Sequence, residues 1–251
     1  MLGRMENQDG LYRGMKDRFA YIIPEQGRLE FAYRGRVYRS EPGMLSLKHP
    51  GEFYSELRRD GLASFDIVFV DIELVHAALG GSVHSEVVFP TPELASSDPR
   101  ARALLRLRAV LRNGAEVFAR EGAAAEAATA LASLARPRDE VRGESGAVAR
   151  ARAYLLERLA EPIRLDELAD HVGMDKFHLI RAFRAQLGAP PYEYLTHQRI
   201  LKAQHLLRAG VPAVQAAAAV GYCDQSQLHR HFRRLVGVTP GVFAQRWRGR
   251  G

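Results

Sequence analysis

The sequence predicts two domains, a mainly β N-terminal domain that ends in helices and an all-α C-terminal domain. Three observations support this prediction. Short strand-like segments alternate with Gly and Pro turns up to residue 90, helical periodicity follows them, and one helical pattern occurs twice after residue 165. We place the first domain at residues 1–136, a polar linker with Pro and Gly at 137–147, and the second domain at 148–251.

The β region has the pattern of a small barrel or sandwich. Short apolar and aromatic runs are separated by turn residues such as Glu41-Pro42-Gly43. Turns at intervals of about 8–12 residues are typical of these folds. We expect a hairpin turn at Gly35. The expected strands are residues 29–33, 37–39, 44–47, 53–57 and 65–70.

Two helices, at residues 98–112 and 115–134, are expected between the β region and the linker. The first carries an apolar stripe of Leu104, Leu107 and Leu111 at i, i+3 and i+7. Such a stripe either pairs with a second copy of the chain or packs on its own domain. The sequence favours neither alternative.

The C-terminal domain shows helical periodicity throughout, and Gly or Pro marks the joints between its segments. The longest expected helix, 191–208, lies in the middle and joins the segments on either side. The other expected helices are residues 148–159, 165–172, 176–186, 213–220, 225–236 and 240–246.

The net charge of +7 is unevenly distributed along the chain. Residues 146–251 contain 16 Lys and Arg against 8 Asp and Glu, whereas residues 1–145 contain 20 against 21. A basic module joined to a neutral one is typical of proteins that bind polyanions such as nucleic acids. A basic domain without a polyanionic partner is the alternative, and charge alone does not decide between them.

Other features restrict the class of protein. No apolar run reaches the roughly 20 residues of a membrane-spanning helix, and Met1 to Phe19 lacks the features of a secretory signal. The single cysteine, Cys223, excludes an internal disulfide. We therefore expect a cytoplasmic protein without a membrane partner.

The strongest signal is an internal repeat. Leu179 and Leu228 begin the same frame, in which Arg follows after two residues, Phe after four, Arg after five, Gly after nine, Pro after twelve and an aromatic after fifteen. Before each frame, Gly173 and Gly221 end an Ala-x-x-Val-Gly segment, and the second copy has one extra residue between that glycine and the leucine. Because glycine permits a sharp turn between helices, each copy is predicted to be a helix-turn-helix.

The second helix of each copy is predicted to have one buried and one exposed face. Leu179 and Phe183, like Leu228 and Phe232, are spaced to face the core. The exposed face of such a helix fits the major groove of DNA, which is about 12 Å wide. The predicted DNA-binding residues are Lys176, Phe177, Ile180, Arg181 and Arg184 in the first copy, and Gln225, Ser226, Gln227, His229, Arg230 and Arg233 in the second.

Residues 150–248 resemble the DNA-binding domain of the AraC/XylS family of bacterial transcription regulators. The most characteristic stretch is AAAVGYCDQSQLHRHFRR at 217–234, followed by GVTP at 237–240. The linking helix matches as well, through Tyr194, RILKA at 199–203 and the two leucines that end the motif. The resemblance implies a sequence-specific regulator, typically an activator, whose two recognition helices enter successive major-groove segments on one face of the DNA.

The resemblance also implies roles for single residues. Arg181 and Arg230 match positions at which the family contacts DNA, and arginine suits guanine O6 and N7. Gln225 and Gln227 are candidates for reading adenine. Lys176, Arg184 and Arg233 are expected to hold phosphates.

The two copies differ in their reading faces. Ile180 is apolar where many family members carry a polar residue, which predicts fewer base hydrogen bonds from the first helix or a contact with a thymine methyl group. After Gly210 there are six basic residues against one acidic residue. We expect the second copy to contribute at least as much of the binding as the first.

The N-terminal domain resembles the family's cupin-like sensor domain, through RVYRSEPGMLSLKHPGE at residues 36–52. The resemblance implies a barrel that binds an unidentified small-molecule effector and controls the DNA-binding domain. Tyr38, Phe53 and Tyr54 either line that site or pack in the core. A homodimer and RNA polymerase are further partners that the resemblance implies.

A metal site, a cofactor and an enzymatic activity are not expected. A catalytic cupin carries several histidines and a glutamate around this turn, but the segment offers only His49 and Glu52. His76 and His84 are isolated in the sequence.

Two alternatives to a ligand-controlled regulator remain. One is an enzyme, either a cupin-type catalyst or an alkyl-transfer DNA-repair protein fused to a helix-turn-helix. Repair chemistry needs an activated cysteine, whereas Cys223 falls in a helix-turn-helix turn. The other is an architectural DNA-binding protein without an effector.

Overall fold

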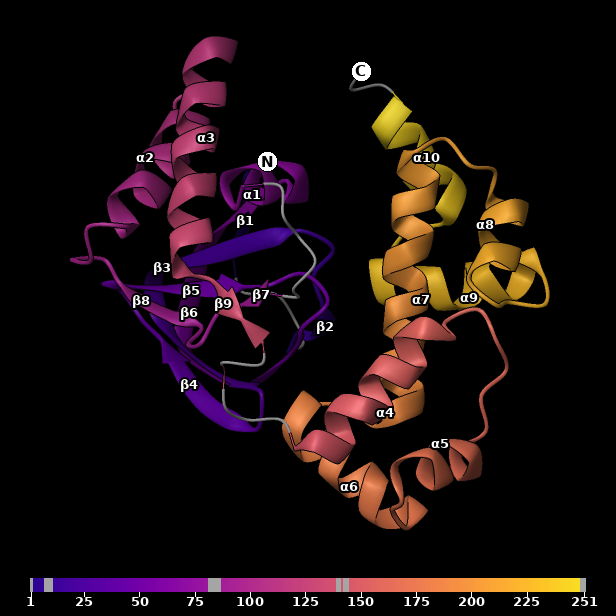
Figure 1. Cartoon of the computed structure of the whole chain (residues 1–251). Coiled ribbons are helices and arrows are strands. Elements are labelled where there is room, and N and C mark those ends of the chain that lie inside the picture. The colour runs from indigo at the N-terminus through magenta and orange to yellow at the C-terminus, as the bar shows by residue number, and fades with distance from the viewer. Residues whose placement is uncertain (1, 7–10, 81–86, 139–140, 142–144, 249–251) are drawn as a thin grey trace. The chain divides into compact units, whose positions relative to one another are not determined.

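The chain folds into two compact units, residues 1–142 and 143–251 (Figure 1). The computed structural model describes residues 2–6, 11–80, 87–138, 141 and 145–248. The expected linker, 137–147, spans the boundary between the units, and five of its residues lie outside the described part. His84 lies outside it as well.

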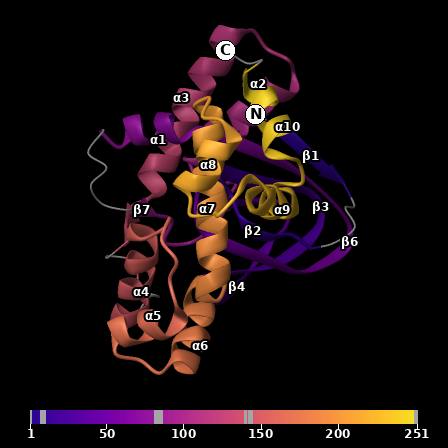
Figure 2. The ribbon, with the colours of Figure 1, turned by 90° about the vertical axis from the view of Figure 1, so that its right-hand side faces the viewer.

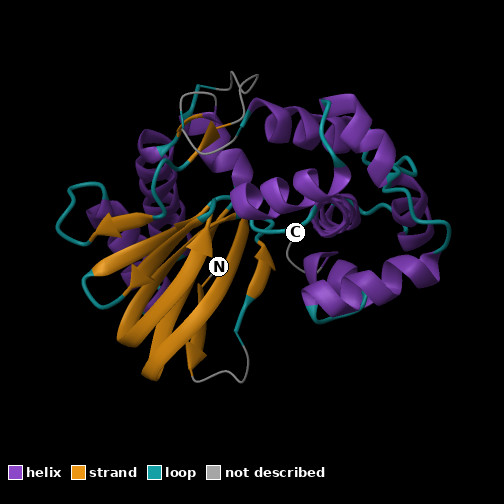
Figure 3. Cartoon of the chain, turned by 90° about the horizontal axis from the view of Figure 1, so that it is seen from below, coloured by secondary structure: helices purple, strands orange, loops and turns teal. Residues whose placement is uncertain are grey.

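The first unit is built on a seven-stranded antiparallel sheet, shown in orange in Figure 3. The strand order is β1-β6-β3-β5-β8, with β2 also paired to β6 and β4 to β3. Its strands are β1 (Leu2–Glu6), β2 (Arg13–Met15), β3 (Phe19–Tyr33), β4 (Arg36–Ser40), β5 (Met44–Lys48), β6 (Phe53–Val70) and β8 (Glu93–Ala95). A separate two-stranded ladder joins β7 (Val87–Val88) to β9 (Arg136–Pro137).

The sheet is open, so the expected barrel is wrong in this respect. Among the described residues, the terminal strand β1 pairs only with β6, and β8 pairs only with β5. Closure would require a ladder between the two ends of the sheet. The expected hairpin at Gly35 is present, because Arg34 and Gly35 both have positive φ, 48° and 73°, as a type I′ turn requires.

The strands β3 and β6 are much longer than the sequence predicted. Residues 53–57 and 65–70 were expected to form separate strands, but β6 runs through both. The intervening polar residues stay in the ladder because β6 pairs with β3 over most of its length, with register shifts between Pro24 and Gln26 and at two later points. Tertiary pairing therefore extends a strand through a segment whose own composition indicated a turn.

Three helices complete the first unit, α1 (Ile72–Ala78), α2 (Ala101–Arg112) and α3 (Val117–Leu134). Leu104 and Leu107 of α2 are buried in the core formed with one face of the sheet, and Leu111 packs against that core. The apolar stripe of α2 therefore packs on its own domain, which was the second of the two alternatives. Arg108 fixes the same helix to the sheet through the buried Asp66, with Nε donating to Oδ2 at 2.5 Å.

In its described residues, the second unit consists of helices joined by turns and loops, without strands (Figure 2). The long helix α7 (Pro191–Arg208) lies at its centre, with α4–α6 along one half and α8–α10 along the other. The remaining helices are α4 (Gly146–Glu157), α5 (Leu165–Val172), α6 (Lys176–Leu187), α8 (Ala213–Ala219), α9 (Gln225–Val236) and α10 (Pro240–Arg248). Within the described residues, no helix combines the length and the apolar character that crossing a membrane would require.

Candidate nucleic-acid interface

The first helix-turn-helix consists of α5 and α6. Gly173 ends α5 in the left-handed conformation, with φ of 69°, and the chain then turns into α6. Asp175 caps α6, since its Oδ1 accepts hydrogen bonds from the backbone N–H groups of Phe177 (2.9 Å) and His178 (3.1 Å). Gly188, with φ of 83°, ends the helix.

The second helix-turn-helix consists of α8 and α9 and contains the extra residue, which the structure accommodates in the turn. Asp224 caps α9, with Oδ1 accepting from the N–H of Gln227 at 2.7 Å, and this bond lowers the pKa of the Asp224 carboxyl. The side chain of Gln227 reaches back, so that its Oε1 accepts from the N–H of Cys223 at 3.1 Å. This reciprocal arrangement is a variant of the capping box and satisfies an N–H in the turn.

The interiors of the two motifs are alike. Leu179 and Leu228 are fully buried. Phe183 meets Tyr194 edge-on, with ring centroids 5.4 Å apart and an interplanar angle of 79°. In the second copy, Phe232 and Phe243 make the same contact at 5.3 Å and 74°. The repeated sequence frame therefore produces one repeated packing arrangement.

The segment between α4 and α5 holds the two motifs together. Arg199 of α7 donates from Nε to the carbonyl of Leu159 and from Nη2 to that of Glu161, both at 2.7 Å. On its other side, this segment touches the turn of the second motif. A Cβ added to Gly221 would lie 2.3 Å from the carbonyl oxygen of Ala160, so only glycine fits there.

The exposed face of α6 carries the side chains predicted for the first copy. Arg181 and Arg184 are exposed, and so is Phe177, at 61%. Ile180 is half-buried. The Lys176 ammonium pairs with Asp166 at 2.9 Å, so the carboxylate of α5 already engages the positive charge at this position.

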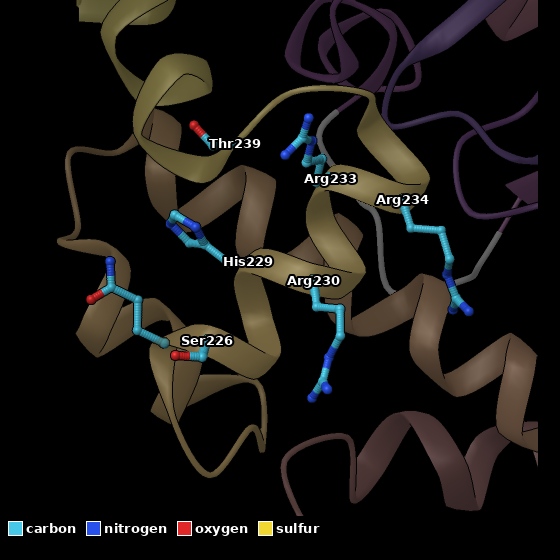
Figure 4. A pocket seen from close by; sticks show the side chains of 7 residues that line it. Ser226, His229, Arg230, Arg233, Arg234 and Thr239 are labelled. Atoms are coloured by element: carbon cyan, nitrogen blue, oxygen red, sulfur yellow. The ribbon is translucent and has the colours of Figure 1, made fainter.

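The exposed face of α9 carries the predicted residues of the second copy and borders an open hollow (Figure 4). Arg230 and Arg233 are exposed and form no ion pair within the described part of the chain. The hollow is lined by Gln225, Ser226, His229, Arg230, Arg233, Arg234 and Thr239. Five of the six residues predicted for this helix are thus brought together, and the sixth, Gln227, is held by the turn.

Two lining residues were absent from the predicted set. Arg234 follows Arg233 on α9, and its Nη2 lies 3.3 Å from Nδ1 of His231. Thr239 precedes α10 and enters the hollow because the loop after Gly237 folds back along α9. The Thr239-Pro240 pair, typical of a helix start, was the available signal for this return.

The electrostatics of α9 favour an anionic partner. Burial and the neighbouring Arg234 and Arg230 lower the pKa of His231, whose ring stacks on Tyr222 at 5.3 Å and 6°. The arginines can donate hydrogen bonds but cannot accept them. The face is therefore suited to phosphate oxygens and to the acceptor atoms of guanine.

The residues around the turn at His49 and Glu52, where the sequence analysis considered a metal site, are engaged in other contacts. Glu52 is buried, and its carboxylate pairs with Arg138 and, at 3.7 Å, with Arg34. Nδ1 of His49 lies 2.7 Å from the carbonyl oxygen of Pro50. Within the described residues, no group of three or more His, Cys, Asp or Glu is placed to hold a metal ion.

Comparisons with known proteins agree with this geometry. Residues 168–246 match the family described as a helix-turn-helix domain. A putative AraC-like transcription regulator of Streptomyces antibioticus is 35% identical over 97 residues, which cover 38% of this chain and 32% of that protein. The chain spans about a third of the length of the first curated relatives it matches.

Two solved structures are similar to this chain, one over less than half of it and the other over nearly all of it. The DNA-binding domain of AdpA, solved with a target DNA, is 32% identical and covers 42% of this chain and 96% of that chain, with a TM-score of 0.41. ToxT of Vibrio cholerae is 11% identical, with 97% and 95% covered and a TM-score of 0.51. The second likeness shows that the two-domain fold extends over nearly the whole chain.

Proposed function

We propose that this chain, which carries a helix-turn-helix domain of the AraC family, is a sequence-specific DNA-binding regulator of transcription. The observation that carries the proposal is the exposed face of α9, where Arg230 and Arg233 point away from the core without an ion-pair partner in the described residues. Unpaired arginines on the second helix of a helix-turn-helix are the side chains that contact bases and phosphates in the major groove.

The roles divide between base reading and backbone contact. Arg230 and Arg181 are the candidates for bidentate contacts with guanine. Gln225, which is exposed at the start of α9, is the candidate for adenine, because the side-chain oxygen of Gln227 is occupied in the turn. Arg184 and Arg233 hold phosphates. Lys176 also binds a phosphate once its ion pair with Asp166 is broken. Ser226 and His229 complete the contact surface.

Selection of bound sequences from a random DNA pool, followed by footprinting, tests the proposal. At about 0.15 M salt, the full chain should bind a selected site at least a thousandfold more tightly than random DNA. Arg102→Ala is a control variant on the exposed side of α2. It removes one arginine outside the proposed interface and should leave this ratio of affinities unchanged. Equal affinity for selected and random DNA would identify a purely electrostatic, architectural binder instead.

Control by a small-molecule effector is the second part of the proposal. The first unit contains a cluster of buried aromatic side chains around Phe31, Tyr33 and Tyr54, with Tyr38 packed against it. Small ligands are bound by apolar and aromatic surfaces with a few polar groups. Calorimetric titration of the full chain with a metabolite panel measures this directly, and the absence of any binding heat would leave an effector-independent regulator.

Association into a homodimer belongs to the proposal as well. With Leu104 and Leu107 buried, the large apolar side chains left exposed on α3 are Val117, at 57%, and Phe118, at 86%. Sedimentation of the full chain with and without Phe118→Ser tests whether they contribute to association. A dimer that contacts RNA polymerase would activate transcription from a promoter that carries the selected site, which transcription in a purified system measures.

A further inference from the structure

The helices of the second unit form two groups that share one support, α7. Helices α4 and α6 pack on one part of α7, and α8, α9 and α10 pack on the rest of it (Figure 2). Because α7 has 18 residues, it is about 27 Å long. Long helices are rarely straight, so α7 alone would define the separation of α6 and α9 only loosely.

A second connection joins the two groups through residues 158–161, the segment that follows α4. The side chain of Leu159 is partly buried and packs against the core of the second motif, which contains Phe232. The backbone of Ala160 closely approaches the turn of that motif at Gly221. A segment that continues the first group along the chain is therefore embedded in the second group.

Arg199 of α7 fastens this segment. Its two hydrogen bonds, to the carbonyl oxygens of Leu159 and Glu161, are both 2.7 Å long. These carbonyls lie just beyond the end of α4, where a helix leaves acceptors without intrahelical partners. Hydrogen bonds from a charged donor are roughly twice as strong as neutral ones, and the planar fork of arginine serves two acceptors at once.

The same guanidinium lies beside the second motif. Its central carbon is 5.8 Å from the ring centroid of Tyr222, a side chain that is only 5% exposed. The Tyr222 ring in turn stacks on His231 of α9. Burial lowers the pKa of Arg199, against the opposing influence of Tyr222. Arg199 thus links the end of α4 to α9 through one buried ring.

We propose that Arg199 is a positioning residue that sets the base-pair spacing at which α6 and α9 bind one DNA molecule together. The proposal deepens the proposed function and rests on it. Moving one part of a DNA site by one base pair shifts it about 3.4 Å along the axis and rotates it by about 35°. Motifs that are held at two points, through α7 and through Arg199, can follow this shift only under strain. In this role Arg199 acts through the helices it holds and not through DNA.

Binding of the full chain to spacing variants of its selected DNA site tests the proposal. The parts read by α6 and α9 are located as the base pairs at which Arg181→Ala and Arg230→Ala lose discrimination, and one base pair is inserted or deleted between them. In fluorescence anisotropy, the wild type should prefer the original spacing by about tenfold or more. Arg199→Met, which removes both hydrogen bonds but keeps an unbranched side chain, should reduce this ratio to about threefold or less.

The ratio of affinities separates positioning from stability. A variant that is merely less stable contains less folded protein, so it loses affinity for every spacing in proportion and keeps the wild-type ratio. Lys202→Met removes a positive charge from an exposed site on the same helix and should also keep that ratio.

Two results with DNA would overturn the proposal. One is an unchanged ratio in Arg199→Met with native circular dichroism, and the other is equal affinity of the wild type for all three spacings. Should Arg199→Met fail to fold, Arg199→Lys, which keeps the charge but lacks the planar fork, should still lower the ratio, and an unchanged ratio there would be equally decisive.

A measurement without DNA separates this inference from the proposed function. Spin labels at Ala185→Cys on α6 and Ala218→Cys on α8, both exposed positions, report the separation of the motifs by pulsed electron resonance, with Cys223→Ser removing the native thiol. The distance distribution should be narrow with Arg199 and broader in Arg199→Met. Equal widths would reject the inference alone, even in a chain that binds its selected site. Failure to discriminate selected from random DNA would reject the proposed regulator, whereas broadening in Arg199→Met would still support the positioning role.

Discussion

The two helix-turn-helix motifs share a frame but differ in what their second helices expose. Each has a glycine at its turn, an aspartate N-cap, a buried Leu and Phe, and a glycine at its end. The positions on the outer face do not follow this symmetry. Ile180, Ala182 and Ala185 of α6 correspond to His229, His231 and Arg234 of α9. Packing and backbone geometry therefore constrain the frame, whereas the surface is free to diverge.

The difference in surface extends to the charges. On α6, the Lys176 ammonium is engaged by Asp166. On α9, three arginines border one hollow together with Thr239. The second motif thus presents more free positive charge to an anionic partner, and that it contributes at least as much of the binding as the first stays a prediction.

The largest expected difference between the motifs is one of stability, at their turn glycines. Gly221→Ala places a Cβ against the backbone of Ala160 and also requires a left-handed residue, so it should lower the free energy of unfolding by about 3 kcal/mol or more. Gly173 also has positive φ, but nothing lies within 4 Å of its Cβ position. Gly173→Ala should therefore cost only about 1 kcal/mol.

Urea unfolding of the two variants measures this contrast. The matched pair separates the cost of the left-handed backbone, common to both, from the contact with Ala160. If the two substitutions destabilised the chain equally, the close approach of the second turn to the segment between α4 and α5 would be refuted.

The next effect concerns sequence reading. Arg230→Ala should weaken binding to the selected DNA site by about 1–3 kcal/mol, with a much smaller loss on random DNA. Arg181→Ala is its counterpart on α6 and should cost less, since its neighbours Ile180 and Ala182 add no hydrogen bonds to bases. Fluorescence anisotropy with both DNAs gives the four affinities. A larger loss from Arg181→Ala would show that the first motif contributes more to sequence-specific binding than the second.

Phosphate contacts should distinguish the motifs less. Arg184 and Arg233 occupy the same place in the repeat, and both are exposed. Replacing either by Ala should weaken specific and random binding alike and reduce the slope of log K against log salt by about 1. Titrations between about 50 and 200 mM salt measure the slope. A loss confined to the selected site would assign that arginine to base reading instead.

The frame of the second unit could be predicted from sequence because its signals are local. The repeat, the turn glycines and the caps each act within a few residues, and the residues predicted on α6 and α9 lie on those helices as expected. The sequence prediction for Gln227 did not include its capping role, because a glutamine at this position suits both an adenine contact and a capping box. Asp224 three residues earlier was the local signal for the cap.

The first unit was less predictable because its decisive contacts are distant in sequence. The length of β6 depends on pairing with β3, which lies some tens of residues away. The burial of Lys48 was not predicted, because a lysine at the end of a short strand indicates a surface position. Only the three-dimensional approach of Phe31 and Tyr54 shows that it is buried.

The smallest expected effect is a pH dependence that His231 gives to the second motif. His231 corresponds to Ala182 of α6, and its pKa is lowered by burial and by Arg234 and Arg230. Since the unfolded chain binds the proton more readily, this histidine should stabilise the folded state fully above about pH 6.5 and lose that contribution as the pH falls toward its folded pKa. Because the ring is partly exposed, we expect only a few tenths of a kcal/mol. His231→Gln should flatten the stability curve between about pH 5 and 7 in urea unfolding, and an unchanged curve would mean that the imidazole is protonated as readily in the fold as in the unfolded chain.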